Sequence, residues 1–127
     1  MARKQDNSYT IWKTLIAPEN RYGSGMGPVI DLGCTPASFR SQLTISSAAR
    51  NGRIFVRGDG PDSQPRITLQ DSDDGVTNWS TTGDWGPASL AARSDFSTFH
   101  TRRFVRVVWA FDPGINITFG INCTEPE

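Results

Sequence analysis

The sequence predicts an all-β protein: a single antiparallel β-sandwich or jelly roll of about eight short strands, with an extended N-terminal arm. From Pro28 onward, apolar residues recur at every second position in short runs, a pattern typical of half-buried antiparallel strands. Gly, Pro, Asn, Asp and Ser interrupt these runs, as turns between strands require. With 127 residues, the chain has the size of one domain. We therefore expect an arm at residues 1–27 and a β-sandwich domain at 28–127.

Eight segments show the strand pattern. They are residues 29–32, 39–46, 53–57, 66–70, 77–81, 98–101, 103–111 and 115–121. Alternation predicts which side chains face the core. These are Leu43, Ile45, Ile54, Val56, Ile67, Leu69, Val105, Val107, Trp109, Phe111, Ile115, Ile117, Phe119 and Ile121. Phe55, Phe104 and Val108 fall on the opposite face, where they are either ordinary exposed residues or part of a patch that contacts a partner.

The connections carry turn signals of their own. Asn51-Gly52 is the strongest two-residue hairpin signal in the chain, because both residues tolerate positive φ. Asp112-Pro113-Gly114 predicts a turn between the two longest strands. In the run LQDSDDGVTNW at residues 69–79, Asp73-Asp74-Gly75 combines side chains that bond back to the backbone with a residue suited to positive φ. We expect a hairpin there, and a longer connection over 80–97.

The first 27 residues lack sustained strand or helix periodicity and end in a Gly-rich segment at 23–27, as expected of an arm. The arm contains Ile11, Trp12, Leu15 and Ile16, which must be buried somewhere. Either the middle of the arm forms an edge strand of its own sandwich, or it packs on another subunit. The sequence leaves both placements open.

Charge and cysteine content narrow the class of partner. Lys and Arg total 13 and Asp and Glu total 13, so the formal net charge is zero, which argues against nucleic acid and removes a barrier to self-association. We expect no export signal or membrane span, because Lys13 and Thr14 divide the apolar residues near the N-terminus. Cys34 and Cys123 are expected to be thiols, with a disulfide as the alternative.

No catalytic or metal-binding pattern stands out. His100 is the sole histidine, and it has neither the spacing of a zinc site nor a nucleophile motif nearby. Residues 71–75, DSDDG, resemble the start of a calcium loop, but glycine comes one position too early and no Glu follows at the twelfth place. We expect no enzyme activity, no cofactor and no bound metal.

Arginines cluster on two of the expected strands. Arg102, Arg103 and Arg106 lie on one, and Arg53 and Arg57 on another. If these strands are neighbours, the arginines form a basic stripe. The stripe is then either a solvated outer face or an interface, since arginine is enriched in interfaces.

Four motifs in this order resemble a recurrent β-sandwich of phage structural proteins. They are DLG at 31–33, LTIS at 43–46, ITLQDSDDGVTNW at 67–79 and RRFVRVVW at 102–109. In such proteins a strand ending in a Gln-(Glu/Asp)-Ser-Asp-Asp-Gly turn precedes a Tyr/Phe-Val-Arg-Val strand. The resemblance covers residues 29–121 and leaves the arm out. It implies a virion component, and the related proteins include jelly-roll capsid decoration (cement) proteins, often trimeric.

From this resemblance we expect a decoration protein that is made in the host cytoplasm and binds the outside of a phage capsid. Its partners would be the major capsid protein and further copies of itself, with a homotrimer favoured. The mechanism would be many small contacts repeated by symmetry. The expected contact residues are three arm anchors and four face residues. They are Trp12, Leu15 and Ile16 in the arm, and Phe55, Arg57, Phe104 and Arg106 on the sheet face.

The alternative is a carbohydrate-binding or receptor-binding module of a phage tail. It predicts that Trp79 and Trp85 are exposed on loops at one end of the sandwich, where they stack on sugar rings. Asp and Asn residues near both tryptophans suit such a site. Glycan-array binding that is lost in Trp85→Ala would favour this hypothesis. No response to any glycan, together with cosedimentation with capsids, would favour the first.

Overall fold

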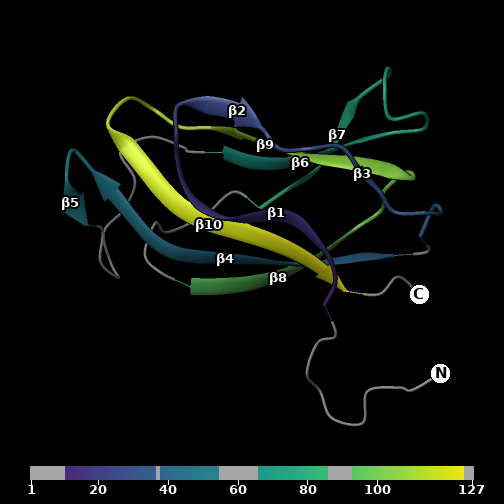
Figure 1. Cartoon of the computed structure of the whole chain (residues 1–127), viewed down its shortest axis with the longest axis horizontal. Helices are drawn as coiled ribbons and strands as arrows, with labels where there is room; N and C mark the ends of the chain where they lie inside the picture. Colours follow the sequence, from purple (N-terminus) through teal and green to yellow (C-terminus); the bar gives the residue numbers. More distant parts are fainter. Residues whose placement is uncertain (1–10, 37, 55–65, 86–92, 125–127) are drawn as a thin grey trace, which may run out of the picture.

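The computed structural model describes residues 11–36, 38–54, 66–85 and 93–124, and it is all-β. Two antiparallel sheets pack face to face (Figure 1), which confirms the predicted sandwich. The described residues form ten strands rather than eight. They are β1 (Ile11–Tyr22), β2 (Ser24–Met26), β3 (Ile30–Asp31), β4 (Phe39–Arg50), β5 (Arg53–Ile54), β6 (Arg66–Ser72), β7 (Ser80–Asp84), β8 (Arg93–Phe99), β9 (Phe104–Ala110) and β10 (Ile115–Thr124).

The strand order is that of a jelly roll. Sheet A runs β1-β10-β4, with β5 and β8 along the free side of β4, and sheet B runs β2-β9-β6-β7, with β3 also pairing β9. The pairs β1–β10, β2/β3–β9, β4–β8 and β6–β7 are nested, so the first strand pairs with the last. The ten strands thus fill the eight positions of two Greek keys. The strands β2 and β3 share one position, because both pair with the same side of β9. The strand β5 takes no position of its own, because it only forms a short hairpin with β4.

Two predicted turns behave differently. Asn51 and Gly52 have φ of 49° and 85° and join β4 to β5 as a hairpin, as predicted. At residues 112–114 the backbone does turn, since the Ile115 N–H donates to the Asp112 carbonyl over 3.1 Å. However, the strands on either side belong to different sheets. This turn is a connection across the sandwich, not the hairpin end of a strand pair.

Residues 11–26 belong to the sandwich itself. Of the two placements left open for the arm, the structure shows the first, because β1 pairs with β10 at the edge of sheet A and β2 pairs with β9. Residues 1–10 lie outside the described part. Register shifts interrupt β1 at three points, so the period-two pattern that marks a strand is lost. That is why the sequence pattern predicted an arm.

The core lies between the sheets and matches the predicted inward set closely. Its buried members are Leu15, Ile16, Leu32, Phe39, Leu43, Ile45, Ala48, Ile67, Leu69, Trp85, Val105, Val107, Phe111, Ile115, Ile117, Phe119, Ile121 and Cys123. Two predicted members differ: Ile54 is 63% exposed, and Trp109 is only partly buried against the core. Val56 lies outside the described residues.

Two strands start three or more residues from their predicted starts. The strand expected at 77–81 starts at Ser80 as β7, and the strand expected at 98–101 is β8, which spans Arg93–Phe99. Both fall largely within the expected long connection. Both are edge strands of their sheets, and their polar sequences show little apolar alternation.

Candidate interaction surfaces

The predicted arm anchors are core residues where the structure describes them. Leu15 and Ile16 are 1% and 4% exposed and pack in the core of their own chain. They are adjacent in sequence yet both buried, because the register of β1 shifts between Thr14 and Ile16. The Trp12 side chain lies outside the description. Leu15 and Ile16 thus belong to the sandwich of their own chain and are not anchors on a free arm.

The predicted face residues divide between described and undescribed parts. Phe55 and Arg57 fall outside the described residues. Phe104 and Arg106 lie on β9, and both are half-buried, whereas Val105 and Val107 between them are fully buried. Phe104 and Arg106 therefore lie together on the outer face of sheet B.

Arg106 and Trp79 form the centre of this face. The Arg106 guanidinium carbon lies 4.0 Å from the centroid of the Trp79 ring, within the range of a cation–π contact. The Arg106 Nε donates a hydrogen bond of 2.8 Å to Gln70 Oε1, and Gln70 is the direct partner of Arg106 in the β6–β9 pair. A hydrogen bond within the chain thus holds the Arg106 side chain over the indole ring before any partner binds.

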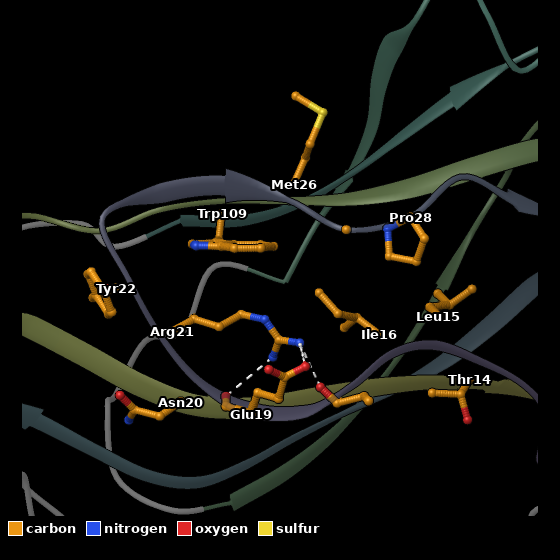
Figure 2. A pocket seen from close by; sticks show the side chains of 12 residues that line it. Thr14, Leu15, Ile16, Glu19, Asn20, Arg21, Tyr22, Met26, Pro28 and Trp109 are labelled. Carbon is orange, nitrogen blue, oxygen red and sulfur yellow. Dashed lines mark hydrogen bonds and ion pairs between the residues drawn. The ribbon is translucent and has the colours of Figure 1, made fainter.

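Further apolar side chains lie on this face and on the loop that carries Trp79. The Arg103 guanidinium carbon lies 5.1 Å from the centroid of the Phe104 ring, and a Cβ on Gly75 would lie 2.8 Å from the same ring, so the 73–79 loop fits closely over it. Val76 is 76% and Met26 57% exposed, and Met26 points away from the sandwich interior in Figure 2. We call Met26, Val76, Trp79, Phe104, Arg106 and Val108 the sheet B outer face.

The loop that joins β6 to β7 forms the predicted hairpin, and its own side chains hold it. Asp74 Oδ1 accepts hydrogen bonds from the backbone N–H groups of Val76 and Thr77, at 2.9 and 2.8 Å. The hydroxyl of Ser72, which is fully buried, donates to the Thr77 carbonyl over 2.6 Å. Gly75 has φ of 75°, as the turn chemistry predicts. These carboxylate and hydroxyl oxygens serve the loop backbone.

Hydrogen bonds from Arg102 connect the same loop to the start of β9. Its guanidinium donates to Asp71 Oδ1 over 3.0 Å and to the backbone carbonyls of Asp71 and Asn78 over 2.7 and 2.8 Å. Its backbone N–H donates to Asp71 Oδ2 over 2.9 Å. Asp71 is 5% exposed, and this charge pairing satisfies its buried carboxylate. The position of Trp79 on the sheet B outer face depends on this clamp.

The predicted basic stripe does not form. The strand β5, which carries Arg53, belongs to sheet A, whereas β9 belongs to sheet B. Arg102 pairs with Asp71, and Arg103 pairs with Asp31 at 2.7 Å. Of the three arginines at 102–106, only Arg106 has no carboxylate among its described partners.

The carboxyl groups of Asp31 and Asp74 have lowered pKa values. Hydrogen bonds from the Arg103 guanidinium and from the Gly33 backbone N–H lower the pKa of Asp31 to about 2. Hydrogen bonds from the backbone N–H groups of Thr77 and Val76 lower the pKa of Asp74 well below its usual range. Both carboxylates are therefore stabilised in the folded chain relative to the unfolded one.

Acidification is expected to destabilise the fold through these two groups. A carboxyl with a depressed folded pKa contributes stability that is present above its unfolded pKa, about 3.9, and is lost as the pH falls towards the folded value. For Asp31 the loss falls between about pH 4 and pH 2. Urea unfolding at pH 7, 4 and 3 measures it. The double variant Asp31→Asn, Asp74→Asn should show a smaller drop over this range, and an unchanged drop would contradict the assignment.

A groove opens at the edge of the sandwich where β1 of sheet A faces β2 and the following residues of sheet B (Figure 2). Its volume is about 770 Å³, within the range of ligand-binding clefts. The lining comes from β1, from residues 26–28 and from Trp109. It consists of Thr14, Leu15, Ile16, Ala17, Glu19, Asn20, Arg21, Tyr22, Met26, Gly27, Pro28 and Trp109.

Arg21 lies at the floor of this groove and is 9% exposed. Its guanidinium donates to the carbonyls of Phe119 and Ala17, both at 2.7 Å, and to that of Glu19 at 3.3 Å. The guanidinium carbon lies 4.9 and 5.3 Å from the ring centroids of Phe119 and Trp109. Burial lowers the pKa of Arg21, and the Glu19 carboxylate opposes this effect.

The sequence pattern gave no indication of Arg21. Its importance follows from the irregular course of β1 around Pro18, which has no N–H to donate to a neighbouring strand. Pro18 packs so closely on Gly120 that a Cβ there would lie 2.9 Å from the proline ring. The one available signal was the proline itself, since proline within a strand marks an edge strand or a bulge.

Other predicted features find simpler roles. Trp85 is 5% exposed, and its Nε1 donates to Ser41 Oγ over 2.9 Å, so it is not the exposed sugar-stacking residue of the alternative hypothesis. His100 is exposed, and its backbone carbonyl accepts a hydrogen bond of 2.6 Å from Thr82. Cys34 is an exposed and Cys123 a buried free thiol, and burial raises the pKa of Cys123 to about 11.

In the described ranges, no three His, Cys, Asp or Glu side chains come together as metal ligands. Nor does this part of the chain contain a helix long and apolar enough to span a membrane.

Comparison with protein-family models, curated proteins and solved structures finds no match. The resemblance to phage virion sandwiches therefore rests on the quoted sequence motifs alone.

Proposed function

We propose that this chain is a structural virion protein that binds and stabilises the outside of a phage capsid. The observation that carries the proposal is the sheet B outer face. The Trp79–Arg106 stack shares this face with Phe104 and with the exposed Met26, which pairs with Val108 of β9. Val76 is exposed on the loop that carries Trp79. Tryptophan and arginine are the residues most enriched at binding hot spots. An apolar face around such a pair is typical of a protein–protein contact.

The rigidity of the face supports this role. Gln70 fixes the Arg106 side chain, and the Arg102 clamp fixes the loop that carries Trp79. A partner would therefore find both side chains already ordered, which reduces the entropy lost on binding. In this proposal the partner is the major capsid protein, and a homotrimer presents several copies of the face together. Modest contacts would then add up through avidity.

Removal of the stack tests the proposal. Purified chain is cosedimented with capsids of the encoding phage that lack it, and virions with and without the chain are compared by negative-stain microscopy. We expect Trp79→Ala and Arg106→Ala each to weaken capsid binding by at least about thirty-fold, as hot-spot substitutions do. Ile54→Ala is the matched control, because Ile54 is also exposed but lies on sheet A, and it should bind normally.

Two results would contradict the proposal. Failure of the wild-type chain to bind capsids would contradict the proposed function itself. Capsid binding that is retained in both variants would show that the sheet B outer face is not the contact. Light scattering of the purified chain measures the molar mass and checks the expected trimer.

A further inference from the structure

The groove along β1 has the shape of a site for an extended chain. Eight of its lining residues come from one strand, between Thr14 and Tyr22. At about 3.3 Å per residue this stretch is roughly 25 Å long. Figure 2 shows the lining spread along this line, with Tyr22 at one end and Thr14 at the other. A long, open-sided groove of this kind accommodates an extended segment of about seven residues better than a compact small molecule.

A buried guanidinium and an indole N–H without an acceptor lie in the middle of the groove. Three backbone carbonyls surround the Arg21 guanidinium, but its one described carboxylate partner is Glu19, at 3.5 Å and with a side chain that is 70% exposed. The Trp109 Nε1 is buried and has no acceptor among the described residues. A buried cation is stable only where anions or acceptors compensate it well. Glu19 supplies that compensation weakly, from the solvent side.

Apolar surface lies on both sides of this cation. Ile16 and Pro28 line one part of the groove and the ring of Trp109 another, while Tyr22, which is 76% exposed, lies at one end. The complementary ligand therefore combines one carboxylate with apolar groups before and after it. The groove shares Met26 with the sheet B outer face but contains neither Trp79 nor Arg106, so variants of the stack test the capsid contact separately.

We propose that this groove binds an extended segment of a partner protein in which an Asp or Glu side chain is flanked by apolar residues. The partner's carboxylate joins or replaces Glu19 at the solvent side of the Arg21 guanidinium. The flanking side chains contact Tyr22 on one side and Ile16 and Pro28 on the other. Pairing of β1 with the β1 strand of a second copy fits less well, because bulges and Pro18 interrupt the edge that two strands would share.

A peptide array tests the charge requirement. Peptides of about seven residues carry Glu at the centre in one half of the array and Gln in the other, with varied apolar and polar residues around it. We expect binders in the Glu half, with the Gln counterpart of each at least about ten-fold weaker, since a charge-assisted hydrogen bond is lost. In a ¹H–¹⁵N spectrum, the best Glu peptide should shift the indole N–H signal of Trp109, assigned through Trp109→Phe.

Two exposed residues of equal exposure provide a matched pair of variants. Tyr22→Ala should weaken binding of the best peptide at least about five-fold, because Tyr22 lines the groove. Val76→Ala should leave it unchanged, because Val76 is equally exposed but lies on the 73–79 loop. Glu19→Gln should tighten binding about three-fold or more, since it removes the resident competitor for Arg21.

Several outcomes would overturn the proposal. These are an array without binders, equal binding of Glu and Gln peptides, and peptide binding that Tyr22→Ala leaves intact. Dissociation of an oligomer by the peptide, seen by light scattering, would assign the groove to a second copy instead. This test can be distinguished from the test of the capsid contact, because Trp79→Ala should weaken capsid binding at least about thirty-fold and leave peptide binding unchanged.

Discussion

Arg21→Ala is expected to lower the free energy of unfolding by about 3 kcal/mol or more, as the loss of partners for buried carbonyls predicts. The substitution removes the donors that bond to the carbonyls of Phe119, Ala17 and Glu19. It also leaves a gap against the rings of Trp109 and Phe119, which adds a cavity cost. Urea unfolding followed by tryptophan fluorescence measures the change.

Two further variants separate the causes. Arg21→Met keeps an apolar stem against the two rings but has no donors, so its loss of stability should be smaller than that of Arg21→Ala by the packing contribution. Arg66→Ala is the surface control, because Arg66 pairs with Asp84 at 2.6 Å with side chains that are 61% and 42% exposed. Such a pair contributes less than about 1 kcal/mol. Equal effects of Arg21→Ala and Arg66→Ala would show that the Arg21 network does not stabilise the sandwich.

Trp85→Ala is expected to cost about 3–5 kcal/mol of unfolding free energy, the range for large buried aromatic residues. Trp85 packs edge-on against Phe99, with ring centroids 5.2 Å apart. Its Nε1 donates to Ser41 on β4 of sheet A, and its backbone N–H donates to the carbonyl of Ile67 on β6 of sheet B. The side chain therefore joins the two sheets, and its removal opens a cavity between them. Chemical denaturation measures the loss.

Trp85→Phe isolates the hydrogen bond from the packing. An aromatic ring remains, and Ser41 Oγ still donates to the Ser97 carbonyl at 3.2 Å, so we expect a loss of about 1–2 kcal/mol of unfolding free energy.

The Trp85 variants also bear on the carbohydrate hypothesis. Loss of glycan binding in Trp85→Ala would accompany loss of the fold, so Trp79→Ala is the informative variant for that hypothesis. A Trp85→Ala chain as stable as wild type would contradict the buried position of the indole.

Local sequence patterns predicted much of the fold correctly. Alternation assigned the inward sides of β6 and β10, because a strand buried on one face repeats its environment every two residues. Asn51-Gly52 and residues 69–79 predicted hairpins, because positive φ and side-chain bonds to nearby backbone are local properties. The pattern failed on β1, where three register shifts remove the alternation. It failed also on β8, an outer strand whose Phe96 is 50% exposed.

The candidate surfaces were predicted only in part. Phe104 and Arg106 were expected on the outer face, since their position on β9 follows from alternation with Val105 and Val107. The partner of Arg106 was not predicted, because Trp79 approaches it only when the β6–β7 loop folds back over sheet B. Leu15 was assigned to an intersubunit contact, because the apolar character of a residue does not tell which chain buries it.

The sequence by itself determined the all-β class, the inward faces of the central strands and the chemistry of the tight turns. Each of these depends on residues a few positions apart. Only the tertiary structure decided the nesting of β1 with β10, the burial of Trp85 and the placement of Arg21 beneath Trp109. Those features depend on contacts such as Arg21 with Phe119, 98 positions apart, and Trp85 with Ser41, 44 apart. Such contacts form only when distant strands pack together, so no local pattern of residues records them.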